Sequence, residues 1–218
     1  MLALLLLLSA PPNPAYAVVE DDPNLPRVLL IGDSISIGYT VPVREKLAGV
    51  ANVHRPPMNC GPSSRGVVTL DRWLGEGKWD VIHWNFGLHD LKFIDDEGNR
   101  ATPETGHQQV PPEQYRKNLR DIGKRLKATG ATVIWRNTTP VPDGTGFRRQ
   151  GDAVTYNQIA AEVMTELGIS THDLYTYAKE HEAEIQRPQN VHYTSEGSDR
   201  LGAEVARVIR EALPKPAE

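Results

Sequence analysis

The residues Gly32-Asp33-Ser34 have the types and the spacing to place a nucleophile at the surface of a fold. They follow four apolar residues, 28–31, which run without alternation as in a strand that is buried on both faces. A tight strand-to-helix turn can expose one small polar side chain, and open α/β sheets place their chemistry at this edge. Ser34 is therefore the first candidate nucleophile. The alternative is that Asp33 and Ser34 only turn the chain and cap a helix.

Strands and amphipathic helices alternate along the rest of the chain, without internal repeats and without a change of composition that would mark a second domain. Strands are expected at residues 27–31, 52–55, 80–86, 132–135 and 169–174, and helices at 43–50, 67–74, 111–129, 153–167, 175–185 and 195–213. This alternation predicts an α/β fold in one domain, a three-layer α/β/α sandwich with a mostly parallel five-stranded sheet. Right-handed crossovers and a flavodoxin-like order, 2-1-3-4-5, would put the switch point beside the first strand.

That topology gathers the glycine and polar segments at 32–34, 61, 87–90 and 192 on one rim of the sheet. Hydrolysis of an ester needs a serine that attacks and a histidine that takes its proton and returns it to the leaving alcohol. It also needs donors that bind the oxyanion as the tetrahedral intermediate forms. The rim contains residue types suited to each of these roles.

Four short segments, in this order, resemble the sequence blocks of the GDSL/SGNH hydrolases. They are Gly32-Asp33-Ser34, Asn59-Cys60-Gly61-Pro62-Ser63, Gly87-Leu88-His89-Asp90 where the family has Gly-x-Asn-Asp, and Val191-His192 where it ends Asp-x-x-His. The blocks cover most of residues 27–205. The resemblance implies an SGNH hydrolase fold, Ser34 and His192 as catalytic residues, and an oxyanion hole formed by Ser34, Gly61 and His89.

Two positions depart from the family pattern. His89 replaces the asparagine whose side chain donates to the oxyanion, and a neutral imidazole also has one N–H to donate. The alternative is a structural histidine that bonds across its loop. Gln189 replaces the aspartate that orients the histidine, which removes electrostatic support for the imidazolium.

The base itself remains, so the sequence predicts a Ser-His dyad. A backbone carbonyl or an amide oxygen of Gln189 or Asn190 would fix the tautomer of His192, and Asp173 or another distant acid is the alternative.

We expect a serine ester hydrolase that acts through an acyl-enzyme on a short acyl group, such as acetyl, carried by a carbohydrate. Two alternatives belong to other classes: an acyltransferase with the same dyad, and a carbohydrate-binding protein with weakened catalysis. The reaction requires no metal and no organic cofactor. A small-molecule or carbohydrate ester is the expected partner, whereas a net charge of −4 argues against nucleic acid. The oligomeric state stays open.

Residues 1–17 have the form of a secretory signal peptide. An apolar block at 2–8 precedes Ala15-Tyr16-Ala17, an A-x-A site, although the usual basic region is missing. Cleavage after Ala17 would leave residues 18–218 as one exported domain, periplasmic or secreted, without stable membrane insertion.

Several other polar residues are expected to be structural. Asp33 should brace the serine turn, and the lone Cys60 should be a buried filler rather than a nucleophile. Residues 95–97 should form a solvated turn rather than a calcium loop. Arg148 and Arg149 should form a solvated pair, with contact to an anionic or sugar substrate as the alternative. Histidines without metal-ligand spacing are read as core or surface residues, namely His54, His83, His107, His172 and His181.

Overall fold

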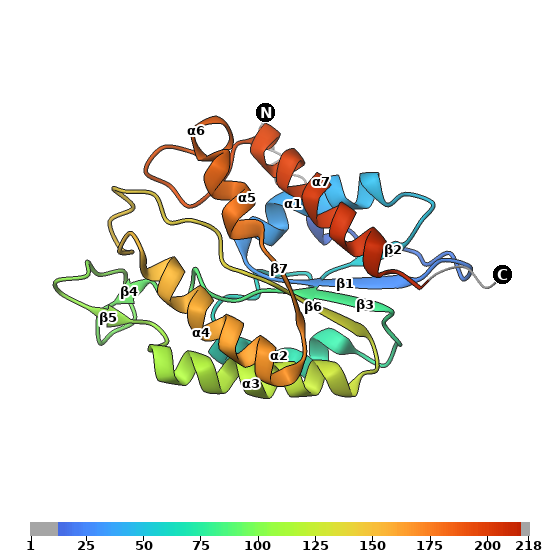
Figure 1. Ribbon diagram of the computed structural model, residues 1–218, viewed down its shortest axis with the longest axis horizontal. Coiled ribbons are helices and arrows are strands. Elements are labelled where there is room, and N and C mark those ends of the chain that lie inside the picture. The colour runs from blue at the N-terminus through green and yellow to red at the C-terminus, as the bar shows by residue number, and fades with distance from the viewer. Residues whose placement is uncertain (1–12, 215–218) are drawn as a thin grey trace, which may run out of the picture.

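The computed structural model describes residues 13–214, which form three layers (Figure 1). The middle layer is a five-stranded parallel sheet with the strand order β2-β1-β3-β6-β7. Its strands are β1 (Arg27–Ile31), β2 (Asn52–His54), β3 (Val81–Trp84), β6 (Thr132–Arg136) and β7 (Ser170–His172). Counted within this sheet the order is 2-1-3-4-5, which confirms the predicted sandwich and its flavodoxin-like order.

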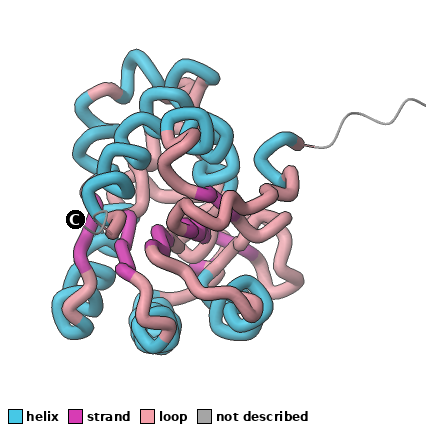
Figure 2. Tube along the Cα trace, turned by 90° about the vertical axis from the view of Figure 1, so that its right-hand side faces the viewer, coloured by secondary structure: helices cyan, strands magenta, loops and turns pink. Residues whose placement is uncertain are grey.

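Helices cover both faces of this sheet, and the two helical layers are visible above and below the strands in Figures 1 and 2. One layer contains α1 (Ser34–Lys46), α5 (Leu174–Glu180), α6 (Glu182–Ile185) and α7 (Ser195–Ala212). The other contains α2 (Ser63–Leu74), α3 (Pro112–Ala128) and α4 (Asp152–Leu167). Because both faces are covered, β1 is buried and apolar over residues 28–31 as its sequence predicted, and the buried residues of β3 and β6 are apolar except for His83 and Arg136.

The core lies where the helices meet the sheet. Trp84 and Trp135 occupy paired positions on β3 and β6, and their ring centroids are 4.6 Å apart in an edge-to-face arrangement. Both rings are fully buried, so these two tryptophans join the central strands of the sheet to the core.

Helix α1 begins at Ser34, whereas the sequence predicted a helix only from residue 43. Gly38 and Pro42 lower the helix propensity of this stretch, which is why the pattern failed there. In the fold these residues allow close contact with α7. A Cβ atom on Gly202 of α7 would lie 2.5 Å from the Pro42 Cβ atom, and tertiary packing therefore overrides the local propensity.

Three other predicted helices have different bounds. Helix α2 begins at Ser63 rather than 67, and the segment expected to be one helix at 175–185 divides into α5 and α6 at His181. The sequence predicted Ser195 as the cap of the last helix, but Ser195 is its first residue and Thr194 is the cap, whose hydroxyl accepts from the Gly197 N–H at 2.9 Å.

The long connection at 91–112 contains a short antiparallel hairpin of β4 (Phe93–Ile94) and β5 (His107–Gln108). Figure 1 shows it beyond the carboxyl ends of the parallel strands. Its turn is closed by Asp95, whose carboxylate accepts from the backbone N–H groups of Glu97 and Asn99, in agreement with the predicted solvated turn.

Residues 13–17 pack on the domain, although they were expected to belong to the signal peptide. The 3₁₀ turn η1 (Pro14–Tyr16) buries Ala15, and Arg44 of α1 donates to the carbonyl oxygens of Pro14 and Ala17. The remainder of the expected signal peptide, residues 1–12, lies outside the described part, and cleavage and export stay predictions. Within residues 13–214 no helix is long and apolar enough to cross a membrane.

Candidate active site

Ser34 stands at the point where β1 turns into α1. Asp33 caps the helix by accepting from the Ile35 N–H at 3.0 Å, which confirms its bracing role. Gly32 permits the tight turn, because a Cβ atom there would lie 2.7 Å from the Ser36 Cβ atom. As the first residue of the helix, Ser34 has a backbone N–H without an intrahelical acceptor. The turn therefore presents both a hydroxyl and a free donor.

His192 approaches this turn from the loop before α7. Its Nε2 atom is 2.9 Å from the Ser34 Oγ atom, although the two residues are 158 positions apart in the chain. The structure thus brings together the two residues that the sequence predicted as catalytic, at hydrogen-bond distance.

Asn190 determines the tautomer of His192. Its Oδ1 atom accepts from the His192 backbone N–H at 3.0 Å and lies 2.7 Å from the His192 Nδ1 atom. A backbone N–H only donates, so the Asn190 atom that it meets is the oxygen, and Nδ1 must then carry the ring proton. The Nε2 atom is left with its lone pair and accepts from the Ser34 hydroxyl, which is the geometry of a general base.

The other candidates for orienting His192 are occupied elsewhere. Gln189 packs its side chain against Gly144 and has a φ of 53°, the only positive φ of a non-glycine residue within residues 13–214. Asp173 caps α5 and accepts from Asn137 Nδ2 and Thr176 Oγ1, each at 2.7 Å. Of the possibilities that the sequence left open, the amide oxygen of Asn190 is the one beside Nδ1.

The surroundings of His192 favour its neutral form. Partial burial lowers the pKa of His192 below its ordinary value of 6.5; the negative charge of Asp33 opposes this shift, and the positive charges of Arg148 and Arg187 add to it. The imidazole is therefore a free base at pH 7.

The oxyanion roles of Gly61 and His89 stay predictions, and the structure gives the state of each donor. Gly61 has a left-handed φ of 67°, and its N–H donates to Asn59 Oδ1 at 2.9 Å, so an oxyanion would have to share this donor. Burial lowers the pKa of His89 to about 4; Asp33 opposes the shift, and nearby cations add to it. The His89 ring is neutral at pH 7 and has one N–H to donate.

Two buried polar contacts that the sequence did not reveal hold the rim together. Asp90 accepts from the Ser63 N–H at 2.8 Å, which ties the loop at 87–90 to the start of α2. Beneath the serine turn, the fully buried Arg136 donates to Asn85 Oδ1 at 2.8 Å and lies 3.8 Å from Asp33 Oδ1. In the sequence, the only sign of this contact is Arg136 itself, an arginine at the end of an apolar strand, because an arginine that is buried there requires polar partners.

Cys60 is fully buried beside the serine turn, and its N–H donates to the Gly32 carbonyl oxygen at 3.2 Å. Burial raises the pKa of the Cys60 thiol to about 11; Arg55 opposes this shift. The thiol is therefore protonated at neutral pH, and the prediction of a buried filler is confirmed.

The prediction of a solvated pair is wrong for Arg148. Arg149 is exposed, but Arg148 is half-buried and donates from Nε to the Leu88 carbonyl oxygen at 2.8 Å. Two adjacent arginines in a loop point in different directions, and the sequence alone does not distinguish them.

Two small cavities, each of about 180 Å³, share His192 as a wall. The first is also lined by Ser34, Ile35, Gly38, Arg187, Tyr193 and Ser198. The second is also lined by Arg100, Thr145, Phe147, Arg148, Gln189, Asn190 and Val191. The site therefore offers one compartment beside the hydroxyl of Ser34 and another on the histidine side.

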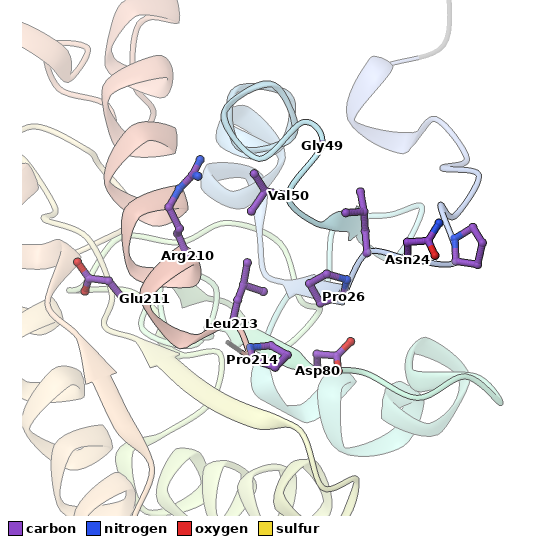
Figure 3. Close-up of a pocket in the computed structure, with 11 residues that line it drawn as sticks. Asn24, Pro26, Gly49, Val50, Asp80, Arg210, Glu211, Leu213 and Pro214 are labelled. Carbon is purple, nitrogen blue, oxygen red and sulfur yellow. The ribbon is translucent and has the colours of Figure 1, made fainter. Parts of the chain in front are cut away.

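A larger hollow of about 850 Å³ lies at the opposite end of the strands, between Pro26, Val50, Asp80 and Arg210 (Figure 3). It borders the amino ends of the strands and is lined by no serine, cysteine or histidine. Parallel sheets place chemistry at their carboxyl ends, so this hollow is not the active-site candidate. Within residues 13–214 no group of three or more His, Cys, Asp or Glu side chains is placed to hold a metal ion.

The orientation of His192 can be tested by its titration. We expect the His192 imidazole of the parent chain to titrate below pH 6.5 when its ring resonances are followed by NMR. The variant Asn190→Asp should raise the pKa of His192 by about one unit or more, since a carboxylate stabilises the protonated ring. Gln189→Glu is the matched control, because it adds the same charge on a side chain that faces Gly144. A larger shift in Gln189→Glu than in Asn190→Asp would contradict the assignment of Asn190.

Comparison with known proteins places the chain in a family. Residues 30–200 match the model of the GDSL-like lipase/acylhydrolase family. A lipase/acylhydrolase from Enterococcus faecalis has a similar structure, with 20% identity, a TM-score of 0.72, and coverage of 88% of this chain and 99% of that one. The acetylxylan esterase Axe2 from Geobacillus stearothermophilus is also similar, with 15% identity, a TM-score of 0.64, and coverage of 86% and 93%.

A further similar structure is the acetyl xylan esterase AlAXEase, with 15% identity, a TM-score of 0.67, and coverage of 84% of this chain and 99% of that one. The search of curated proteins finds no match. The family match spans most of the chain and includes Ser34 and His192. The chain belongs to the GDSL-like lipase/acylhydrolase family and is a carboxylic ester hydrolase of the GDSL/SGNH type.

Proposed function

We propose that the protein hydrolyses esters with a Ser34-His192 dyad through an acyl-enzyme. The observation that carries this proposal is the 2.9 Å contact between Ser34 Oγ and the unprotonated Nε2 atom of His192. In the first step Oγ attacks the carbonyl carbon while its proton passes to Nε2, and the imidazolium then protonates the leaving alcohol. In the second step Nε2 takes a proton from water, whose oxygen attacks the acyl carbon, and the imidazolium returns the proton to Ser34 Oγ as the bond between Oγ and the acyl carbon breaks.

The imidazolium formed in each step would be held by an amide instead of a carboxylate. Asn190 Oδ1 accepts the Nδ1 proton and keeps the ring oriented, but it supplies no full negative charge. We therefore expect slower turnover of simple esters than in a relative with a complete triad.

The proposed oxyanion hole consists of the backbone N–H groups of Ser34 and Gly61 and the ring N–H of His89. Each comes from a different segment at the carboxyl end of the sheet, and the proposed role requires that the three donors converge on the oxyanion. The Gly61 N–H is shared with Asn59 at 2.9 Å, so the remaining donors carry more of the oxyanion's charge.

A short acyl group, such as acetyl on a carbohydrate, is the proposed substrate. The compartment beside Ser34 is small, about 180 Å³, which suits a short acyl chain better than a long one. Two of the similar structures are named as acetyl xylan esterases, which supports this class by analogy of fold. The A-x-A site after the apolar N-terminal block supports action outside the cytoplasm, where polysaccharide esters occur.

Removal of the nucleophile tests the mechanism directly. We expect Ser34→Ala to lower kcat for 4-nitrophenyl acetate by at least about a thousandfold, because no other group takes over the attack. A serine-directed fluorophosphonate should label the parent chain and not the variant. Labelling that persists in the variant, or hydrolysis that remains unchanged, would refute the assignment. A parent chain that is not labelled would favour the binding-protein alternative.

Replacement of Asn190 tests the electrostatic part of the dyad. We expect Asn190→Asp to raise kcat by about tenfold, since a carboxylate stabilises the imidazolium that forms during attack. Asn190→Ala should lower kcat, because the ring loses its acceptor. Equal rates in both variants and the parent chain would show that Asn190 has no part in orienting the base.

Replacement of His89 distinguishes the oxyanion role from a structural one. We expect His89→Ala to lower kcat by about a hundredfold with little change in KM, whereas His89→Asn, which restores a side-chain donor, should keep most of the activity. Thermal unfolding of both variants is the control. If activity falls only in proportion to stability, or if the asparagine variant is as slow as the alanine variant, His89 is structural.

A further inference from the structure

The rim of the active site is positively charged, although the chain has a net charge of −4. Cationic side chains lie around it, among them Arg65, Lys92, Arg100 and Arg148. Partial burial lowers the pKa of Lys92, and repulsion from Arg148, Arg100 and Arg65 lowers it further. In residues 13–214 none of the four forms an ion pair within 4.0 Å.

Phe147 holds two of these cations on one ring. The Cζ atom of Arg100 is 4.7 Å from the ring centroid, and the Cζ atom of Arg148 is 4.6 Å from it. Cation–π contact stabilises each guanidinium, but it does not neutralise the repulsion between them. Burial lowers the pKa of Arg148 to about 10; Asp33 opposes this shift, and Arg100 adds to it.

The guanidinium of Arg148 is anchored but not satisfied. Its Nε atom donates to the Leu88 carbonyl oxygen at 2.8 Å, which fixes the plane of the group. Within the described part of the chain its two terminal nitrogens donate no hydrogen bond. A fixed, half-buried guanidinium with free donors is suited to a planar carboxylate, which accepts two parallel hydrogen bonds.

Both arginines line the second of the two cavities described above, together with Phe147 and His192. His192 lines this second cavity and Ser34 does not, whereas Ser34 and His192 both line the first cavity. In the proposed reaction the acyl carbon bonds to Ser34 Oγ and the leaving oxygen takes its proton from His192. The cavity of the arginines therefore lies on the side of the leaving alcohol.

We propose that Arg100 and Arg148 bind a carboxylate on the alcohol half of the ester, so that the enzyme acts on acyl esters of acidic alcohols such as acidic sugars. The proposal rests on the proposed hydrolysis by Ser34 and His192. It deepens that proposal by assigning a substrate class to the cavity of about 180 Å³ beside His192.

Matched aryl acetates test this assignment in kinetics. The anionic substrate is 4-acetoxybenzoate and the neutral one is 4-acetoxybenzamide, each corrected for its rate with hydroxide. We expect the ratio of kcat/KM, anionic over neutral, to fall by about tenfold in Arg100→Gln, because one charged hydrogen-bond donor is lost. Arg149→Gln is the control, since Arg149 is exposed on the same loop as Arg148 and lies outside the cavity. An unchanged ratio in Arg100→Gln, or an equal fall in Arg149→Gln, would overturn the proposal.

A second pair of esters tests which half of the substrate carries the bound carboxylate. The 4-nitrophenyl ester of succinic acid carries its carboxylate in the acyl half, and 4-nitrophenyl butyrate is its neutral counterpart. We expect the ratio of kcat/KM for these two esters, anionic over neutral, to change less in Arg100→Gln than the ratio for 4-acetoxybenzoate and 4-acetoxybenzamide. A larger change would place the anion in the acyl half and overturn the assignment to the alcohol half.

Binding to the Ser34→Ala variant tests the anion site without catalysis. We expect 4-acetamidobenzoate to bind this variant more tightly than 4-acetamidobenzamide, and Arg100→Gln or Arg148→Lys in the same background to remove most of the difference. Because this readout needs no turnover, it separates the two proposals. Preferential binding of the carboxylate with no hydrolysis by the parent chain would refute only the proposed hydrolysis, and equal binding of both compounds would refute the anion site.

Discussion

The separation of α1 and α7 is the constraint on which the active-site geometry depends. Ser34 is the first residue of α1, and His192 precedes the first residue of α7 by three positions, so each helix carries one partner at its amino end. Gly202 allows Pro42 to approach closely, and a Cβ atom on Gly38 would lie 3.1 Å from Ser198 Oγ. Larger side chains at either glycine would separate the helices, and with them the Oγ and Nε2 atoms that are 2.9 Å apart.

Electrostatics at the site differ from those of a complete triad because the partner of His192 is neutral. Asn190 provides the hydrogen bond that fixes the tautomer, while the negative charge that acts on the ring is that of the buried Asp33. The cations at the rim are therefore less compensated than they would be beside a carboxylate. In the proposed mechanism, the neutral Asn190 makes His192 a weaker base and also leaves the site more positive, which favours a substrate that brings its own negative charge.

Much of this arrangement could be predicted from the sequence, and the exceptions have physical causes. The strand order and the meeting of Ser34 with His192 follow from alternating elements and from short motifs at strand ends. The start of α1 was missed because contact with α7 outweighs the propensities of Gly38 and Pro42. The choice of Asn190 over Gln189 depends on a left-handed backbone at Gln189, which turns that side chain towards Gly144.

The hydrogen bond between Asn190 and His192 also has a consequence for the evolution of this enzyme. The codons for asparagine and aspartate differ by a single base transition, so one point mutation would place a carboxylate where the amide oxygen now lies, 2.7 Å from Nδ1. The family position at Gln189 is less accessible, since a glutamine codon needs more than one base change to encode aspartate. A population under selection for faster ester hydrolysis would therefore reach a triad through residue 190, with its acid displaced by one position from that of its relatives.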